Sequence, residues 1–369
     1  IHGTGFSVSD VDAASGTMTA TFTVGEGDIT LVAGDSGVTI TANNASTVSF
    51  TGTLSQIDAL LTGTSTGTIV YNNGSDTPVA STTITLTVND GGNTGADPGL
   101  TGDGSSEEDS ASQTINITAL NDDPINAGSL PADITVTEDV LSNVDLSAVD
   151  FSDVDAASSS LTVTLTTSTG GELTVAAGTG ITLGGTSTSR TFTGTLTDLN
   201  AYFNNASNIQ YLHPTANLNG NDSDTITVVI NDNGNTGSGG GADQTLGVVN
   251  VDIAAVNDAP VNTVPGTQTI AEDTTTAIAG ISISDVDAGS SNLTTRLQVS
   301  AGVLNVSLSG SATISAGSNG SGDVTIQGSS TDINATLASL TYLGNSNVNG
   351  VAADTLTVTT NDLGNTGSG

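Results

Sequence analysis

The sequence predicts an all-β chain of tandem antiparallel β-sandwich repeats, each about 135 residues long. Three observations lead to this fold class. Short apolar segments alternate with Thr, Ser or Asn with a period of two, which is typical of strands with one buried face. Clusters of Gly, Ser, Asn and Asp separate these segments and indicate turns. Four motifs also recur in the same order along the chain.

The first two motifs are Ser-Asp-Val-Asp-Ala and an Asn-Asp pair that opens a Gly-rich segment after an apolar strand. The other two are Asn-Asp-Xaa-Pro and Glu-Asp. Successive copies lie 143 and 132 residues apart for the first motif, 142 and 130 for the second, 136 for the third and 134 for the fourth. In motif order, their acidic and amide residues are Asp10, Asp12, Asp153, Asp155, Asp285 and Asp287; Asp90, Asp232 and Asp362; Asn121, Asp122, Asn257 and Asp258; Glu138, Asp139, Glu272 and Asp273.

The Asn-Asp-Xaa-Pro motif predicts the domain boundaries, because Pro ends a strand and favours extended backbone before it. We therefore expect repeat 1 at 1–122, repeat 2 at 123–258 and repeat 3 at 259–369. Repeat 1 is expected to lack its beginning and repeat 3 its final strand, which suggests a window on a longer array.

Repeat 2 contains seven segments with the period-two pattern, and each is expected to form a strand that faces one core. In chain order their apolar positions are Ile134 and Val136; Val144 and Leu146; Leu161, Val163 and Leu165; Leu173 and Val175; Ile181 and Leu183; Ile226, Val228 and Ile230; Leu246, Val248, Val251 and Ile253.

One segment of each repeat departs from this pattern and predicts a short helix that crosses between the two sheets. Its three copies begin at Ser55, Thr197 and Thr331, which are expected N-caps, and apolar residues follow at helical spacing. The Asp after Thr197 and Thr331 favours a helix N-terminus.

The composition is strongly acidic and excludes several partners. The chain has 38 acidic residues against two Lys or Arg, with a net charge of −36, which excludes nucleic acid and anionic lipid. Most of the acids are Asp, which is favoured in turns and in oxygen-ligand cation sites. There is no Cys to form stabilising disulfides, so a bound metal is the natural substitute. No apolar run is long enough to insert into a membrane.

The topology of a sandwich gathers the acidic motifs at the junctions between repeats. The turn after the second strand and the turn before the last strand lie at the end where the linker enters, so Asp153, Asp155 and Asp232 should meet Asn121 and Asp122. Glu138, Asp139, Asp222 and Asp224 are expected at the other end, the last two in the loop before the sixth strand. They should lie near Asn257 and Asp258 and near Asp285, Asp287 and Asp362. Ca²⁺ prefers six to eight such oxygen ligands, although Asp and Asn in turns also commonly bond their own backbone.

This order of motifs resembles the bacterial cadherin-like repeats of large secreted adhesins, including those exported by type I secretion. The resemblance covers all three repeats and implies a cadherin-like or Ig-like Greek-key sandwich. It also implies Ca²⁺ at each junction, holding neighbouring repeats in a stiff, extended line. The sequence departs from the family in its shorter linkers and in repeat 1, which has Asp76 but no match to Asp224. The repeat-in-toxin nonapeptide array is not present.

The sequence does not predict an enzyme. Gly63-Thr-Ser65-Thr-Gly67 matches a serine-hydrolase pattern but lies in a low-complexity loop rather than in a strand–turn–helix context. His213 does not recur in the other repeats, and paired carboxylates of a glycosidase would need an aromatic cleft. The Gly-rich stretch 239–241 is expected to be a flexible loop, and without Lys it cannot be a phosphate loop.

Three functions are compatible with these features. The leading one is an extender, a stiff stalk that holds an adhesive tip away from a bacterial cell and mediates attachment to a cell or surface through an unknown receptor. A second is a segment that self-associates into an extracellular filament or sheath through exposed sheet edges. A third is a binding module, for which 96–110 is the candidate insertion, although a solvated loop explains it as well.

Overall fold

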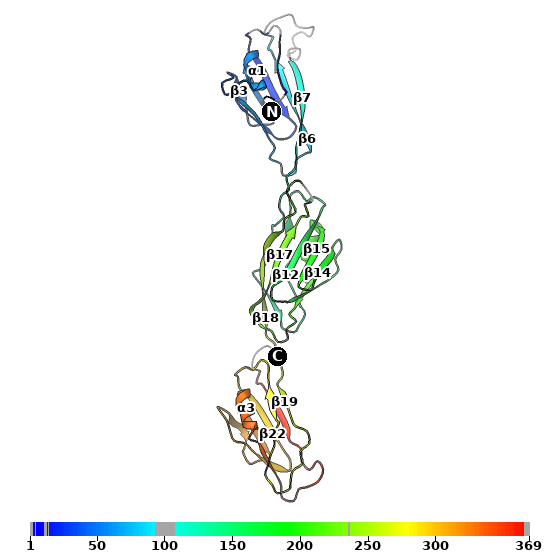
Figure 1. Cartoon of the computed structure of the whole chain (residues 1–369), viewed down its shortest axis with the longest axis vertical. Helices are drawn as coiled ribbons and strands as arrows, with labels where there is room; N and C mark the ends of the chain where they lie inside the picture. The colour runs from blue at the N-terminus through cyan, green and yellow to red at the C-terminus, as the bar shows by residue number, and fades with distance from the viewer. Residues whose placement is uncertain are drawn as a thin grey trace.

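The computed structural model describes residues 3, 5–10, 13, 15–92, 108–234 and 237–364. The chain forms three lobes arranged end to end, with a narrow connection between neighbours (Figure 1). Each lobe encloses its own cluster of buried apolar side chains, built from residues within 6–86, 134–253 and 278–342. We propose that each cluster is the core of one domain, with boundaries after Asp122 and Asp258.

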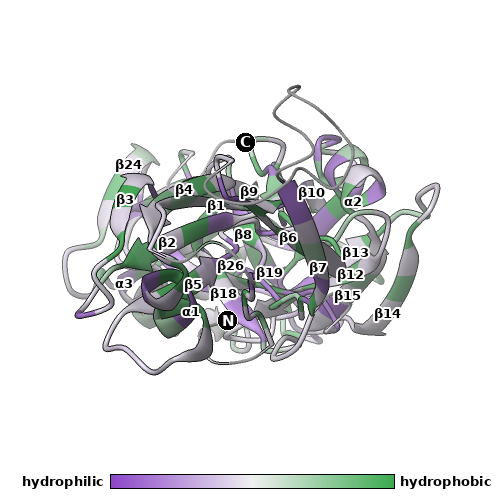
Figure 2. Cartoon of the chain, turned by 90° about the horizontal axis from the view of Figure 1, so that it is seen from above, coloured by the Kyte–Doolittle hydropathy of each residue, from purple (hydrophilic) through white to green (hydrophobic). Residues whose placement is uncertain are grey.

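The structure is all-β, with strands in every lobe and one short helix in each. Viewed along the molecule, the strands carry both hydrophobic and hydrophilic bands (Figure 2). This pattern is expected where one face of a sheet covers a core and the other faces solvent. Among the described residues, no helix is long and apolar enough to cross a membrane.

The first lobe has a five-stranded antiparallel sheet in the order β3-β4-β1-β6-β7 and a facing pair, β2-β5. Its elements are β1 Met18–Val24, β2 Asp28–Val32, β3 Thr39–Ala42, β4 Thr47–Gly52, α1 Leu54–Thr62, β5 Thr68–Asn72, β6 Ser81–Asn89 and β7 Glu108–Asn116. Phe22 lies at the centre of the core, 5.4 Å from Phe6 and 6.1 Å from Phe50 between ring centroids.

The second lobe has a six-stranded sheet in the order β14-β15-β12-β17-β18-β9, a three-stranded sheet β10-β16-β13, and the pair β11-β8. Its elements are β8 Ile125–Asn126, β9 Asp133–Thr137, β10 Ser142–Asn143, β11 Phe151–Ser152, β12 Ser160–Thr167, β13 Glu172–Val175, β14 Thr182–Thr186, β15 Ser189–Thr195, α2 Leu196–Phe203, β16 Ile209–Leu212, β17 Gly220–Asn231 and β18 Gln244–Ala254. Strand β9 joins β18 in parallel, and the other pairs in this lobe are antiparallel.

The third lobe repeats this plan with a four-stranded sheet β24-β25-β22-β27, a three-stranded sheet β20-β26-β23 and the pair β19-β21. Its elements are β19 Val261–Thr263, β20 Thr276–Ala277, β21 Ser282–Ser284, β22 Leu293–Gln298, β23 Gly302–Asn305, β24 Thr313–Gly317, β25 Asp323–Gly328, α3 Ser330–Leu337, β26 Thr341–Gly344 and β27 Thr357–Asn361.

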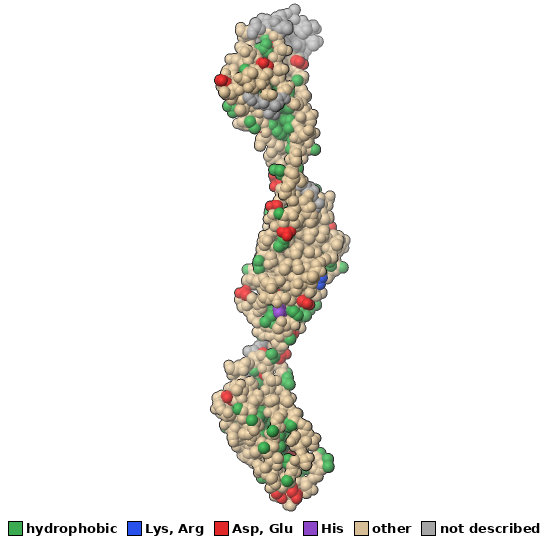
Figure 3. Space-filling view, viewed as in Figure 1, with side chains coloured by type: hydrophobic (Ala, Val, Ile, Leu, Met, Phe, Trp, Pro, Cys, Tyr) green, Lys and Arg blue, Asp and Glu red, His purple; other side chains and the backbone are tan. Residues whose placement is uncertain are grey.

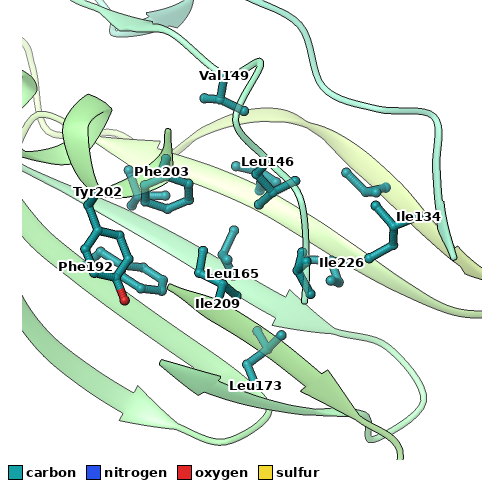
Figure 4. Close-up of a cluster of buried hydrophobic side chains, with 14 of the residues drawn as sticks. Ile134, Leu146, Val149, Leu165, Leu173, Phe192, Tyr202, Phe203, Ile209 and Ile226 are labelled. Atoms are coloured by element: carbon teal, nitrogen blue, oxygen red, sulfur yellow. The ribbon is translucent and has the colours of Figure 1, made fainter. Parts of the chain in front are cut away.

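The predicted helix is confirmed in all three lobes, but each begins two residues earlier than expected. The N-caps are Thr53, Thr195 and Ser329, whose hydroxyls accept a hydrogen bond from the backbone N–H three residues later. In the second lobe, Tyr202 and Phe203 of α2 point into the core, and the ring centroid of Phe203 lies 5.2 Å from that of Phe192 (Figure 4). Burial of this face holds the helix between the two sheets.

The strand prediction for repeat 2 holds at most positions, with one error of register. Val249, Val251 and Ile253 face the core, whereas Val248 is 51% exposed instead of buried. A bulge between β17 and β18 near Gly247 shifts the pairing there and reverses the alternation. Val144 and Leu146 are buried as expected, although they follow the two-residue strand β10 rather than lie in it.

Candidate cation sites at the junctions

The first junction joins the linker between the first two lobes to the top of the second lobe. Asp153 and Asp155 follow β11, and Asp232 follows β17. The Asp153 Oδ1 atom accepts the backbone N–H groups of Asp155 at 3.1 Å and Ala156 at 2.9 Å, which tightens this turn. The linker reaches the turn directly, because the Asp122 backbone N–H donates to Asp155 Oδ2 at 3.1 Å. Asp232 Oδ1 accepts from Gly234 N–H and Gly241 N–H, each at 3.1 Å.

This junction contains buried oxygens that no protein donor satisfies. Asn121 Oδ1 and Asp153 Oδ2 accept no hydrogen bond from the described residues. Asp155 and Asp232 lie beside them, and one carboxylate oxygen of each accepts the N–H groups given above. Buried oxygens need a hydrogen-bond donor or a cation, so these oxygens are candidate cation ligands.

The second junction repeats the arrangement one domain further along. The Asp258 backbone N–H donates to Asp287 Oδ2 at 2.8 Å, and the Asn257 amide donates to Asp362 Oδ2 at 2.5 Å. Asp285 Oδ1 accepts from the N–H groups of Asp287 and Ala288, as in the first junction. Asn257 Oδ1 and Asp285 Oδ2 are buried and accept no hydrogen bond from the described residues.

The electrostatics of both junctions disfavour ionised carboxylates when no cation is bound. Desolvation, followed by the hydrogen bond with Asp155, raises the pKa of Asp153 to about 6. Desolvation and the hydrogen bond with Asp287 raise the pKa of Asp285 in the same way. The two arginines of the chain contact other groups, Arg190 the Leu173 carbonyl and Arg296 the Asp323 carboxylate. A divalent cation between the carboxylates would reverse the direction of these shifts.

The lower end of the second lobe reaches the second junction through two asparagines. Asn217 donates its backbone N–H to the Asp139 carboxylate at 3.2 Å and its side-chain amide to Asp258 Oδ2. Asn219 donates to Glu138 Oε2 at 2.8 Å, and the other Glu138 oxygen accepts the Val256 N–H at 2.6 Å. Glu138 and Asp139 therefore lie beside the linker, as the sequence predicts.

Sequence reasoning missed these asparagines, although a signal for them exists. Asn217 and Asn219 belong to Asn-Xaa-Asn-Gly, which recurs at 347–350 in the third lobe. There Asn347 N–H donates to Asp273 at 3.3 Å and the Asn349 amide to Glu272 at 3.0 Å. In both lobes, the asparagines of Asn-Xaa-Asn-Gly therefore donate hydrogen bonds to the carboxylates of the Glu-Asp motif.

Asp222 and Asp224 lie within β17 rather than in a loop, which corrects the sequence-based expectation. Asp224 is fully engaged by the protein: it accepts the N–H groups of Ser168, Thr169 and Gly171 and the Tyr211 hydroxyl at 2.8–3.1 Å. We therefore leave Asp224 out of the candidate cation sites. In the first lobe the buried hydroxyl of Thr82 occupies the matching place and accepts the Glu26 N–H.

Asp222 belongs to a different acidic group, formed with Asp133 and Asp252. Ligand atoms of these three residues lie within 4.8 Å of one another, and Asp222 and Asp133 are exposed. The Asp222 N–H donates to Asp252 and the Asn250 amide donates to Asp133, so local hydrogen bonds account for the arrangement.

The top of the first lobe carries the remaining predicted ligands. Asp10 Oδ1 accepts the Ala13 N–H at 3.0 Å, as its counterparts in the other lobes do, and Asp90 Oδ1 accepts the Gly92 N–H at 3.1 Å. Asp12 and residues 96–107 of the candidate insertion lie outside the described residues. The surface view shows acidic side chains at both narrow connections between the lobes (Figure 3).

Comparison with known proteins gives only distant structural likenesses. No family model and no curated protein matches the chain. Similar solved structures include PcdhgB3 EC1-4 (14% identity, TM-score 0.29, covering 84% of this chain), the human desmocollin-1 ectodomain (12%, 0.26, 83%) and a protocadherin gammaB7 EC3-6 cis-dimer (14%, 0.26, 82%). The chain spans 58%, 46% and 58% of those structures. The fold assignment rests on the strand pairing of the chain itself.

Proposed function

We propose that this chain is a calcium-rigidified extender segment of a large bacterial cell-surface adhesin. The observation that carries the proposal is the pair of buried, unsatisfied oxygens at each junction, from Asn121 and Asp153 at the first and from Asn257 and Asp285 at the second. They belong to the acidic and amide residues that recur once per repeat, and they join each linker to the domain that follows it.

Calcium is the cation that suits these groups best. Carboxylate and amide oxygens are hard ligands, and Ca²⁺ accepts six to eight of them in flexible geometry, whereas Mg²⁺ demands a strict octahedron. Asn121, Asp122, Asp153, Asp155 and Asp232 would provide the first site. Asn257, Asp258, Asp285, Asp287 and Asp362 would provide the second, with Glu138 and Asp139 on the opposite side. Among the described residues, the junction carboxylates form no group of three with ligand atoms all within 4.8 Å of one another, so a bound ion would draw them closer together.

A bound ion would convert each linker into a rigid joint. Two like charges about 4 Å apart repel by roughly 4 kcal/mol at the effective dielectric near a protein surface. Without a cation this repulsion weakens the contact between each linker and its Asp-Val-Asp turn, and only hydrogen bonds hold the joint. With the cation bound, the same carboxylates hold neighbouring domains in line, which is a mechanical role that needs no catalytic group.

The motif resemblance supports an extracellular bacterial setting for this role. Extracellular fluid contains enough calcium to fill sites of modest affinity, whereas cytosol does not. A chain of net charge −36 would stay expanded until it met that calcium, which couples folding to export.

Self-association into a filament is a second candidate, because β7 is a terminal strand of its sheet in the described part of the chain. Strand β7 pairs with β6 on one side, whereas its counterpart β18 pairs with both β17 and β9. All but one of the β7 side chains are exposed. An open edge of nine residues can accept a strand from another copy. Light scattering during size exclusion distinguishes the two roles, since a monomer at high concentration contradicts the filament.

Calorimetric titration tests the calcium claim. We expect the chelator-treated protein to bind Ca²⁺ and to bind Mg²⁺ much more weakly. Asp155→Asn should abolish Ca²⁺ binding at the first junction, and Asp287→Asn should abolish it at the second. Asp28→Asn serves as the matched control, because Asp28 is exposed at the start of β2 and lies outside the proposed sites. Unchanged heats in both junction variants would contradict the proposed sites.

A further inference from the structure

The Gly-rich segment 237–241 of the second lobe lies against the linker of the first junction. Ser238 N–H donates to the Ala119 carbonyl at 3.0 Å, and Asn121 N–H donates to the Ser238 carbonyl at 3.4 Å. Leu120 and Ser238 form an isolated parallel bridge. The expected loop at 239–241 is a loop in the structure, and at Gly240 and Gly241 it lies against Asn121 of the linker and Asp232.

Close approach explains why glycine occupies these positions. A Cβ atom at Gly240 would lie 2.1 Å from Asn121 Cγ and 2.3 Å from Asn121 Oδ1. A Cβ atom at Gly237, whose φ is +83°, would lie 2.4 Å from the Leu120 carbonyl carbon. The backbone of this segment thus covers the amide of Asn121, whose Oδ1 is one of the buried unsatisfied oxygens.

Segment 237–241 also contacts Asp232, the candidate ligand that follows β17. Gly241 N–H donates to Asp232 Oδ1 at 3.1 Å, and the Gly241 carbonyl accepts from the Asn231 amide at 2.9 Å. Segment 237–241 therefore contacts one candidate ligand from the linker, Asn121, and one from the following domain, Asp232.

We propose that segment 237–241 is a positioning clamp for the first junction: it docks the linker on the second domain before a cation binds and fixes Asn121 and Asp232 as ligands. Its effect on calcium affinity rests on the proposed function, whereas linker docking does not. At the second junction, the inter-domain hydrogen bonds between described residues use the carboxylates of Asp287 and Asp362.

Gly240→Ala is the critical variant, because Gly240 does not have the positive φ that would strain an alanine. Gly266→Ala is the matched control, since a Cβ atom there meets nothing within 4 Å. In an Asp287→Asn background, which removes Ca²⁺ binding at the second junction, we expect Gly240→Ala to weaken Ca²⁺ binding by about 10- to 100-fold, as for loss of other ligand-orienting contacts. Gly266→Ala should leave the affinity unchanged.

Linker docking is measured separately in chelator by distances between spin labels. The chain has no native Cys, so labels at Thr114→Cys and Thr182→Cys report on the first junction alone. We expect a narrow distance distribution that Gly240→Ala broadens. Adding Asn121→Ala removes the atoms that the new methyl group meets, so the double variant should return to the width of Asn121→Ala alone.

The outcomes separate the two proposals. If the parent protein binds no calcium, the proposed function fails, and the label distances still test the clamp. If calcium binds but Gly240→Ala changes neither the affinity nor the distance distribution, the clamp is wrong. A Gly240→Ala defect that persists in the double variant would also overturn it, because it would show that contact with Asn121 is not the cause.

Discussion

Aspartates have two different surroundings in this molecule. At the junctions, Asp153 Oδ2 and Asp285 Oδ2 are buried without a hydrogen-bond donor, whereas Asp224 and Asp354 are surrounded by donors. Burial alone would raise the pKa of Asp224, but N–H and hydroxyl donors outweigh it and lower the pKa to about 2. The same balance lowers the pKa of Asp354 to about 2. Sequence spacing could not separate the two roles, because both kinds of Asp lie near turns and only the third dimension shows what surrounds them.

We predict that Asp224→Asn destabilises the second domain by about 2–3 kcal/mol, because an amide cannot accept from all the donors that face it. Urea unfolding in chelator measures the change. Asp222→Asn, two residues away and exposed, should stay within about 0.5 kcal/mol of the parent. Equal effects of the two substitutions would show that the donors around Asp224 do not stabilise the fold.

The pKa directions predict two opposite slopes of stability against pH in calcium-free protein. Asp224 and Asp354 have folded pKa values near 2, below the ordinary 3.8, so their stabilisation is present above pH 4 and is lost as the pH falls towards 2. Asp153, at about 6, binds a proton more readily when folded, so its contribution falls as the pH rises from 4 to 6. Unfolding free energies from pH 2 to 7 in chelator should therefore pass through a maximum near pH 4 to 5. Calcium should abolish the decline between pH 4 and 6, and a decline that persists in calcium would contradict the junction assignment.

At the scale of elements, apolar alternation predicts most of the second lobe because each strand buries one face. It fails at Val248, where a bulge beside Gly247 changes the register, and a bulge leaves no period-two signal. It also does not predict β15. Phe192 is the one buried apolar side chain among the seven residues of this strand, so the strand has no apolar alternation. The helices are predictable from their apolar spacing, but several Thr and Ser residues compete for the N-cap, so the start is placed two residues late.

The capping geometry gives a sharp test with a built-in control. Thr195 accepts the Asp198 N–H at 3.2 Å, whereas Thr197, the N-cap expected from the sequence, is an exposed residue of the first turn. Thr195→Ala should destabilise the second domain by about 1 kcal/mol, and Thr197→Ala should have little effect. Thermal unfolding of both variants measures the difference, and a reversed order would contradict the helix boundaries.

At the scale of the whole molecule, the recurrence of motifs predicts the repeated architecture, and topology predicts that acidic residues meet at the junctions. The meeting of Asp122 with Asp155 and of Asp258 with Asp287 agrees with that expectation. The clamp and the Asn-Xaa-Asn-Gly contacts were not predictable, because their contacts depend on loop conformations rather than on the strand pattern. The resulting shape is a line of domains in which each joint depends on few hydrogen bonds and many negative charges.

Small-angle scattering of the intact chain during a calcium titration tests the central claim most directly. With calcium we expect a single extended particle whose maximum dimension matches three domains in line. In chelator we expect a broader distribution of dimensions that returns to the extended form on re-addition of calcium, and not of magnesium. Scattering profiles that are identical in calcium and chelator would contradict the account that a cation locks the junctions.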